Sequence, residues 1–190
     1  MRFRRPDRRA TQEAQTRAWL RGVVRSGLFD DARTERELRG VISADLPYLD
    51  PRVATLWIEE ERAAWASDAA AWPSVTDHER LTLAFDRLTS DGLPVLIGCE
   101  DHWAATAALA GLSPHADGLL WFTPMDVWHA VDEPMLEVNV WDRNGVNQWE
   151  GAALVERAID AFAEQGLQAR FDEGRLEVAA LWQRFPHSPA

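Results

Sequence analysis

The chain has 190 residues, of which 46% are hydrophobic and 27% charged, and these globular values exclude a disordered or collagen-like chain. A chain of this length buries enough apolar surface to fold without a structural metal, and its single cysteine, Cys99, excludes an internal disulfide. We expect a cytoplasmic protein with no membrane span, because no apolar signal-peptide core follows the basic N-terminus and the longest apolar stretch, residues 92–99, is too short to cross a bilayer.

The net charge of −11 is unevenly distributed along the sequence. Residues 1–9 carry five Arg and one Asp, and the other 181 residues carry 15 Arg against 30 acidic residues. We interpret residues 1–9 as a flexible basic arm, the one segment suited to nucleic acid, whereas the acidic body repels phosphates and attracts basic proteins. Lysine is absent, which excludes a lysine Schiff base and ordinary P-loop chemistry.

Three helices are predicted first, over residues 10–26, 31–43 and 51–71. They form a helical segment over residues 10–73. Trp57 and Trp65 lie about 80° apart on a helical wheel, which is typical of side chains that pack into a core.

The sequence after Pro73 alternates between helical and strand patterns. Thr76 and Glu79 form a capping box at the start of a helix that ends near Asp91. The other predicted elements are a buried strand at 94–99, a helix at 102–110, a buried strand at 118–123, a helix at 124–131, a half-exposed strand at 135–141, a helix at 151–165 and a hairpin at 168–172 and 175–182. The order α-β-α-β-α-β-α-β-β predicts an α+β, sandwich-like domain with a four- to five-stranded sheet over residues 74–186, packed with the helical segment as one unit.

The segment WPSVTDHERLTLAFDRL, residues 72–88, resembles a family of uncharacterised proteins of high-GC Gram-positive bacteria, a domain of unknown function. The matching residues are Trp72, Pro73, Val75, Thr76, Asp77, Arg80, Leu81, Ala84, Phe85 and Leu88. The resemblance extends over most of residues 20–184, including the C-terminal Leu-Trp-x-Arg ending, and implies one integrated fold with no activity assigned. The chain departs from the family pattern at residues 123–126 and 132–134, so a family site at that junction would be altered here.

The richest group of chemically useful side chains follows the predicted strand at 94–99. Sites in α/β sheets gather at the carboxyl ends of strands, and a second predicted strand ends nearby. His102, Asp126 and His129 would form a two-histidine, one-carboxylate metal site suited to Zn or Fe(II), with Glu100 as a spare base.

Two other interpretations of this group stay open. Cys99 with His102 or His129 would form a nucleophile–base pair. Alternatively, Asp101 is only an N-cap, Asp126 lies in the first turn of a helix near its positive end, the histidines lie on the surface, and Cys99 is a buried core residue.

Ten tryptophans are many for a chain of this length, and several adjoin acidic residues. The candidates for binding a partner are Trp103, Trp128, Trp141 and Trp149. An exposed Trp surrounded by acids binds arginine through cation–π contact and charge steering. We therefore expect a non-enzymatic interaction module for a basic partner, similar to an immunity protein or an inhibitor, that requires no cofactor. The alternative is a small metal-assisted hydrolase.

Overall fold

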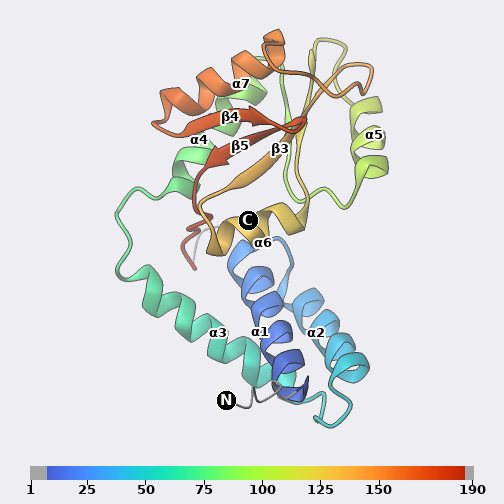
Figure 1. Ribbon diagram of the computed structural model, residues 1–190, viewed down its shortest axis with the longest axis vertical. Coiled ribbons are helices and arrows are strands. Elements are labelled where there is room, and N and C mark those ends of the chain that lie inside the picture. Colours follow the sequence, from blue (N-terminus) through green and yellow to red (C-terminus); the bar gives the residue numbers. More distant parts are fainter. Residues whose placement is uncertain (1–7, 187–190) are drawn as a thin grey trace, which may run out of the picture. The chain divides into compact units, whose positions relative to one another are not determined.

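The computed structural model describes residues 8–186, which divide into two compact units (Figure 1). The helical unit comprises residues 8–71 with 185–186, and the α/β unit comprises Trp72–Arg184. This boundary lies two residues before the one expected at 73/74. Residues 1–7 of the expected basic arm lie outside the described residues, and the first helix begins at Arg8. That the two units pack together stays a prediction.

The helical unit contains the three helices that the sequence predicts. They are α1 (Arg8–Ser26), α2 (Asp31–Asp45) and α3 (Val53–Ala69), and each packs against the other two. Trp57 and Trp65 are both buried, which confirms their assignment to the core. The buried Arg25 of α1 donates hydrogen bonds to Glu61 at 2.6 Å and Asp68 at 2.7 Å on α3, so its charge is paired inside the unit.

The α/β unit is built on a five-stranded sheet in the order β1-β2-β3-β5-β4. Its elements are α4 (Asp77–Ser90), β1 (Val95–Leu96), α5 (His102–Ala110), β2 (Gly118–Trp121), α6 (Pro124–Asp132), β3 (Leu136–Asp142), α7 (Ala153–Glu164), β4 (Gln168–Asp172) and β5 (Arg175–Ala179). Only β1 and β2 run parallel; the other pairs are antiparallel. The α+β class and the order of elements are confirmed.

Local sequence signals explain where these elements begin and turn. The capping box of Thr76 and Glu79 is present at the start of α4. Glu173 and Gly174 both have positive φ, at 43° and 90°, which is the geometry of a tight hairpin between β4 and β5. None of the helices described between residues 8 and 186 combines the length and apolar character needed to cross a membrane.

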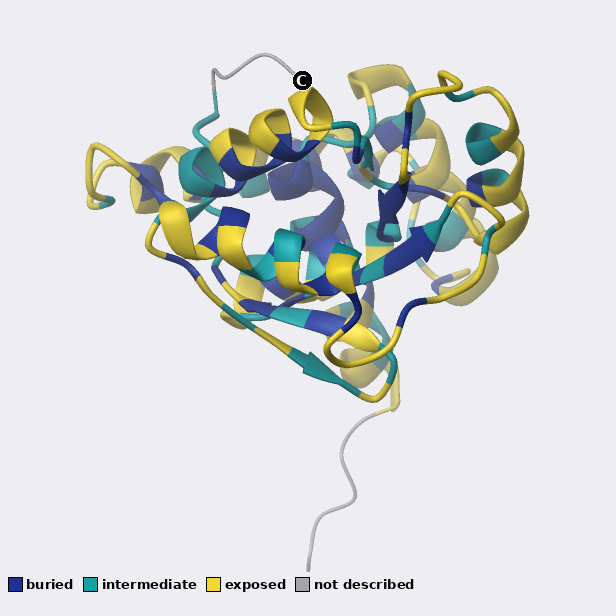
Figure 2. Ribbon diagram, turned by 90° about the horizontal axis from the view of Figure 1, so that it is seen from above, coloured by how far each residue is buried: buried dark blue, intermediate teal, exposed yellow. Residues whose placement is uncertain are grey.

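The two faces of the sheet are covered differently. Helices α4 and α7 pack together over one face, where Phe85 lies 6.0 Å from Phe162 and 5.6 Å from Phe122 between ring centroids (Figure 1). Along each helix the buried residues form one stripe, and exposed residues occupy the outer side (Figure 2). On the other face, α5 packs over β2 and α6 packs against β3, which leaves the part over β5 and β4 uncovered among the described residues.

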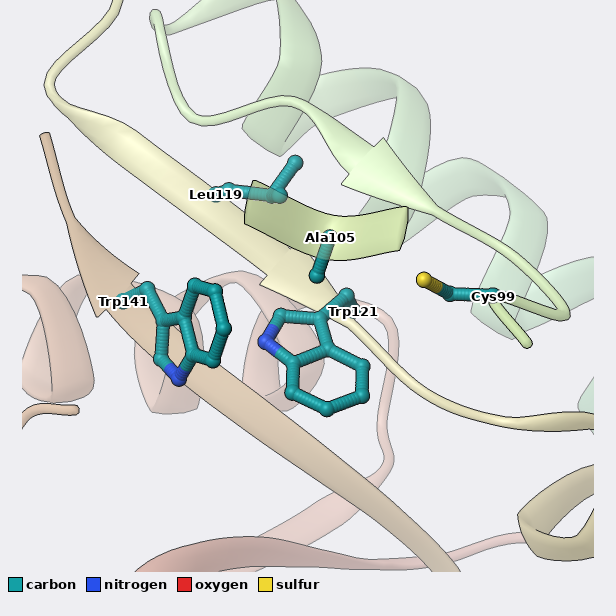
Figure 3. Close-up of a cluster of buried hydrophobic side chains, with 5 residues drawn as sticks. All are labelled: Cys99, Ala105, Leu119, Trp121 and Trp141. Atoms are coloured by element: carbon teal, nitrogen blue, oxygen red, sulfur yellow. The ribbon is translucent and has the colours of Figure 1, made fainter. Parts of the chain in front are cut away.

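Two expectations about the strands are wrong in detail. The strand expected at 94–99 is only two residues long and half-buried, because Gly98 turns the chain at φ 67° and leaves Ile97 42% exposed. Trp141, expected on the half-exposed side of its strand, is only 9% exposed. It packs with Trp121 and Ala105 under α5 (Figure 3).

Candidate functional site

The ends of β1 and β2 meet, as the sequence predicts, and Cys99 is buried there. Its backbone N–H donates to the Phe122 carbonyl at 2.9 Å, which joins the two strand ends. The side chain is 4% exposed, and its thiol donates to the Asp101 carbonyl at 3.1 Å. Burial raises the pKa of the Cys99 thiol above its usual value, which favours the neutral form. The interpretation as a buried core cysteine is the one that fits.

The expected metal site does not form. Asp126 is held in a capping box, where Oδ2 accepts from the Thr123 N–H at 2.6 Å and the Thr123 hydroxyl at 2.7 Å. His102 and His129 are both exposed. Within residues 8–186, no group of three or more His, Cys, Asp and Glu side chains is placed to hold a metal ion.

Capping also accounts for the neighbouring Asp101. Its Oδ1 accepts from the Ala104 N–H at 2.8 Å, as expected for the residue that starts α5. Glu100, the spare base of the expected metal site, is exposed at the surface. These positions agree with the other interpretation, in which Asp101 is an N-cap, Asp126 lies in the first turn of a helix and the histidines lie on the surface.

The four candidate tryptophans have different environments. Trp103 is 71% exposed and Trp149 is 64% exposed, so both present most of the indole to solvent. Trp128 is partly buried, and Trp141 belongs to the hydrophobic cluster under α5. Trp103 and Trp149 are therefore the two candidates that lie on the surface.

Helix α5, which carries Trp103, has an unusual composition for a surface helix. Its nine residues, HWAATAALA, contain no acidic residue and no arginine, and Ala105 is the only buried one. Trp103 lies in the first turn against His102, with ring centroids 4.5 Å apart, and stands two residues after Asp101, which with Glu100 is exposed. An apolar helix that remains exposed, with acids at one end, is typical of an interaction surface.

The net negative charge belongs to the α/β unit. Residues 72–184 contain 19 acidic residues and seven arginines, a net charge of −12. Residues 1–71 contain 12 acidic residues and 13 arginines, a net charge of +1. The α/β unit therefore carries the negative field of the chain, which attracts positively charged groups and repels phosphates.

The uncovered sheet face carries a charged ladder that sequence reasoning missed. Glu137 on β3 lies directly opposite Glu177 on β5, an arrangement that is destabilising when two like charges are left alone. Arg175 contacts Glu137 and lies 4.0 Å from Asp126, and Arg170 contacts Glu177. The two arginines neutralise the opposed glutamates. This ladder depends on the register between β3, β5 and β4, and the alternating pattern within each strand does not reveal that register.

A groove of about 630 Å³ lies beside β4, the last strand of the sheet. Ile159 and Ala163 of α7 line one part, and Gln168 and Arg170 of β4 line another. Ile159 is only partly buried because it lies at this margin. No sequence motif marks this groove.

A third feature joins the two segments that carry the family resemblance. Asp77 Oδ2 accepts a hydrogen bond from the Leu181 N–H at 3.2 Å, and the His78 ring lies edge-on to Trp182 at 4.7 Å. Burial, together with the charge of Arg184, lowers the pKa of His78 to about 4. The neutral imidazole and the ring contact hold the C-terminal segment against α4.

The family model of a domain of unknown function, DUF6891, matches residues 9–185, and the chain therefore belongs to this family. The match spans both units, which agrees with the range over which the sequence resembles a family of unknown function. No curated protein and no solved structure matches the chain.

Proposed function

We propose that the α/β unit is a non-enzymatic interaction module that binds a basic protein, in the manner of an immunity protein or an inhibitor. The observation that carries this proposal is Trp103, which stands 71% exposed on an apolar helix beside Glu100 and Asp101. Trp is the residue type most often found as a binding anchor, and a guanidinium group packs well on its face.

The charge of the unit supports the same partner chemistry. A net charge of −12 on residues 72–184 accelerates the approach of a basic surface and disfavours nucleic acid. The neighbouring acids supply the electrostatic part of the contact, and the indole supplies the apolar part. Neither Cys99 nor the set of His102, Asp126 and His129 offers a reactive site. The exposed helix α5 is therefore the surface on which this proposal rests.

The experiment is capture of partners from a lysate of the source organism at low salt, with a charge-matched acidic protein as control. Wild-type chain is compared with Trp103→Ala and with Leu83→Ala, which removes a 54% exposed apolar side chain from α4 instead. We expect one basic protein to be enriched by the wild type and by Leu83→Ala, and at least tenfold less by Trp103→Ala.

Raising the salt concentration should weaken the captured complex, because exposed charges are screened. Equal capture of the same protein by Trp103→Ala would refute the role of Trp103. An acidic partner, or no protein enriched over the control, would refute the proposed function.

A further inference from the structure

We propose that the N-terminal segment of this chain, residues 1–7, binds the Trp103 surface of the α/β unit and competes there with the basic partner. The Trp103 surface comprises Glu100, Asp101 and the exposed side of α5 that carries Trp103. This competition rests on the proposed function, because the segment and the partner use the same surface.

The side chains of the N-terminal segment have the chemistry that the Trp103 surface binds. Residues 1–7, MRFRRPD, contain three arginines, one phenylalanine and one aspartate, and they precede the first residue of α1. Guanidinium groups pack on the face of an indole and pair with carboxylates, and an aromatic ring adds apolar contact. The segment therefore offers the same groups that we expect of a basic partner.

The charges of the two units direct the segment toward the α/β unit. Residues 8–71, the rest of the helical unit at its N-terminal side, contain 11 acidic residues and ten arginines and are nearly neutral. Residues 72–184 carry a net charge of −12. A segment rich in arginine is therefore attracted far more strongly by the α/β unit than by the helices to which it is joined.

Within the α/β unit, several acidic side chains already have arginine partners. They are Asp91, Asp117, Glu137, Glu164 and Glu177. Asp101 differs from them. Among the described residues its side chain accepts one hydrogen bond, from the Ala104 N–H to Oδ1 at 2.8 Å, which leaves Oδ2 for a guanidinium group.

The exposed indoles narrow the choice of surface further. Trp103 is 71% exposed and has two acidic residues shortly before it, whereas the other exposed indole, Trp149 at 64%, is followed by a single acid, Glu150. No residue from His102 to Ala110 is an arginine that would repel the segment. Trp103 is therefore the indole that we assign to the segment, and Trp149 serves as the comparison.

Occupation by the segment would set a threshold for partner binding. A competitor that belongs to the chain is present wherever the surface is present. The apparent affinity for a partner then falls by the fraction of chains whose surface is free. A weakly binding basic protein would be excluded, and a tightly binding one would displace the segment.

The test measures how a fluorescent peptide with the sequence of residues 1–7 binds to the full-length chain at low salt. The neutral-segment variant replaces the three arginines of residues 1–7 by Gln, all of them outside α1. It is combined with Trp103→Ala in a double-mutant cycle. Trp149→Ala is the matched control, since it removes another exposed indole that adjoins an acid.

We expect Trp103→Ala to weaken peptide binding at least fivefold and Trp149→Ala less than twofold. The neutral-segment variant should bind the peptide more tightly than the wild type, because its own segment no longer competes. A more negative net charge alone raises the affinity equally whether or not Trp103 is present. The gain from the neutral segment should therefore be at least threefold larger with Trp103 than in Trp103→Ala.

The proposal is overturned if the peptide does not bind, if Trp103→Ala and Trp149→Ala lose affinity equally, or if the neutral segment brings the same gain with and without Trp103. Its failure is distinguishable from that of the proposed function. Partner capture that depends on Trp103 without the extra gain refutes the segment alone. Peptide binding that depends on Trp103, with no partner captured, refutes the proposed function alone.

Discussion

Burial of His78 should make the α/β unit less stable at mildly acidic pH. Burial, and then the charge of Arg184, lowers the pKa of His78 from 6.5 to about 4, and Glu79 offsets part of this effect. Between these two pH values the unfolded chain binds a proton at His78 and the folded chain does not. The stabilising contribution of the neutral imidazole is therefore complete above about pH 6.5 and is lost as the pH falls toward 4.

The size of this loss of stability follows from the difference between the pKa values of His78 in the unfolded and folded chain. One unit of pKa difference corresponds to about 1.4 kcal/mol, and pH 5 lies about 1.5 units below the unfolded value, which gives about 2 kcal/mol. Because the side chain is only partly buried, solvent screening reduces the expected loss between pH 7 and pH 5 to about 1–2 kcal/mol.

The assay combines an NMR titration with urea unfolding of the wild type and of His78→Gln. The variant identifies the His78 signal among the five histidines, and it removes the titrating group while carboxylates elsewhere titrate in both proteins. We expect an NMR pKa well below 6 and a wild-type stability that falls more than that of His78→Gln between pH 7 and pH 5. A pKa near 6.5, or equal losses in the two proteins, would refute the reasoning.

Three further outcomes test the packing of the same unit. Gly118→Ala should lower the unfolding free energy by about 1–3 kcal/mol or more, since the new Cβ would lie 2.1 Å from the Trp141 carbonyl oxygen. An unchanged stability in urea unfolding would contradict the close approach of β2 and β3. Cys99 should react with a thiol reagent far more slowly in the folded protein than in urea, because it is buried and its pKa is raised, and equal rates would contradict its burial. Thr76→Ala should lower the unfolding free energy by about 1 kcal/mol, because the capping box with Glu79 is lost. An unchanged midpoint of urea unfolding would mean that α4 does not begin at this cap.

The order of elements was predictable from the sequence because it depends on local signals. Apolar residues at helical spacing, the cap at Thr76 and the Glu173-Gly174 turn each act within a few residues. The length of β1 was not predictable in the same way. Residues 94–99 are uniformly apolar, and such a run does not show that the chain turns at Gly98.

The candidate site was harder to predict because it depends on long-range contacts. Asp126 makes local capping bonds with Thr123, but it also lies 4.0 Å from Arg175 of β5, a contact that no local signal reveals. The burial of Trp141 depends on α5, more than 30 residues earlier in the chain. Neighbouring acids did not distinguish the exposed Trp103 from the buried Trp141, because both have acidic residues beside them in the sequence.

The contact between Trp121 and Trp141 should give the folded protein a distinct circular dichroism signature. The two rings lie 5.0 Å apart at an interplanar angle of 74°, close enough for their electronic transitions to couple (Figure 3). Coupled indoles produce paired circular dichroism bands of opposite sign, and isolated tryptophans do not. Because this pair joins β2 to β3 beneath α5, the paired bands would report the closure of that part of the core without any label, even among ten tryptophans.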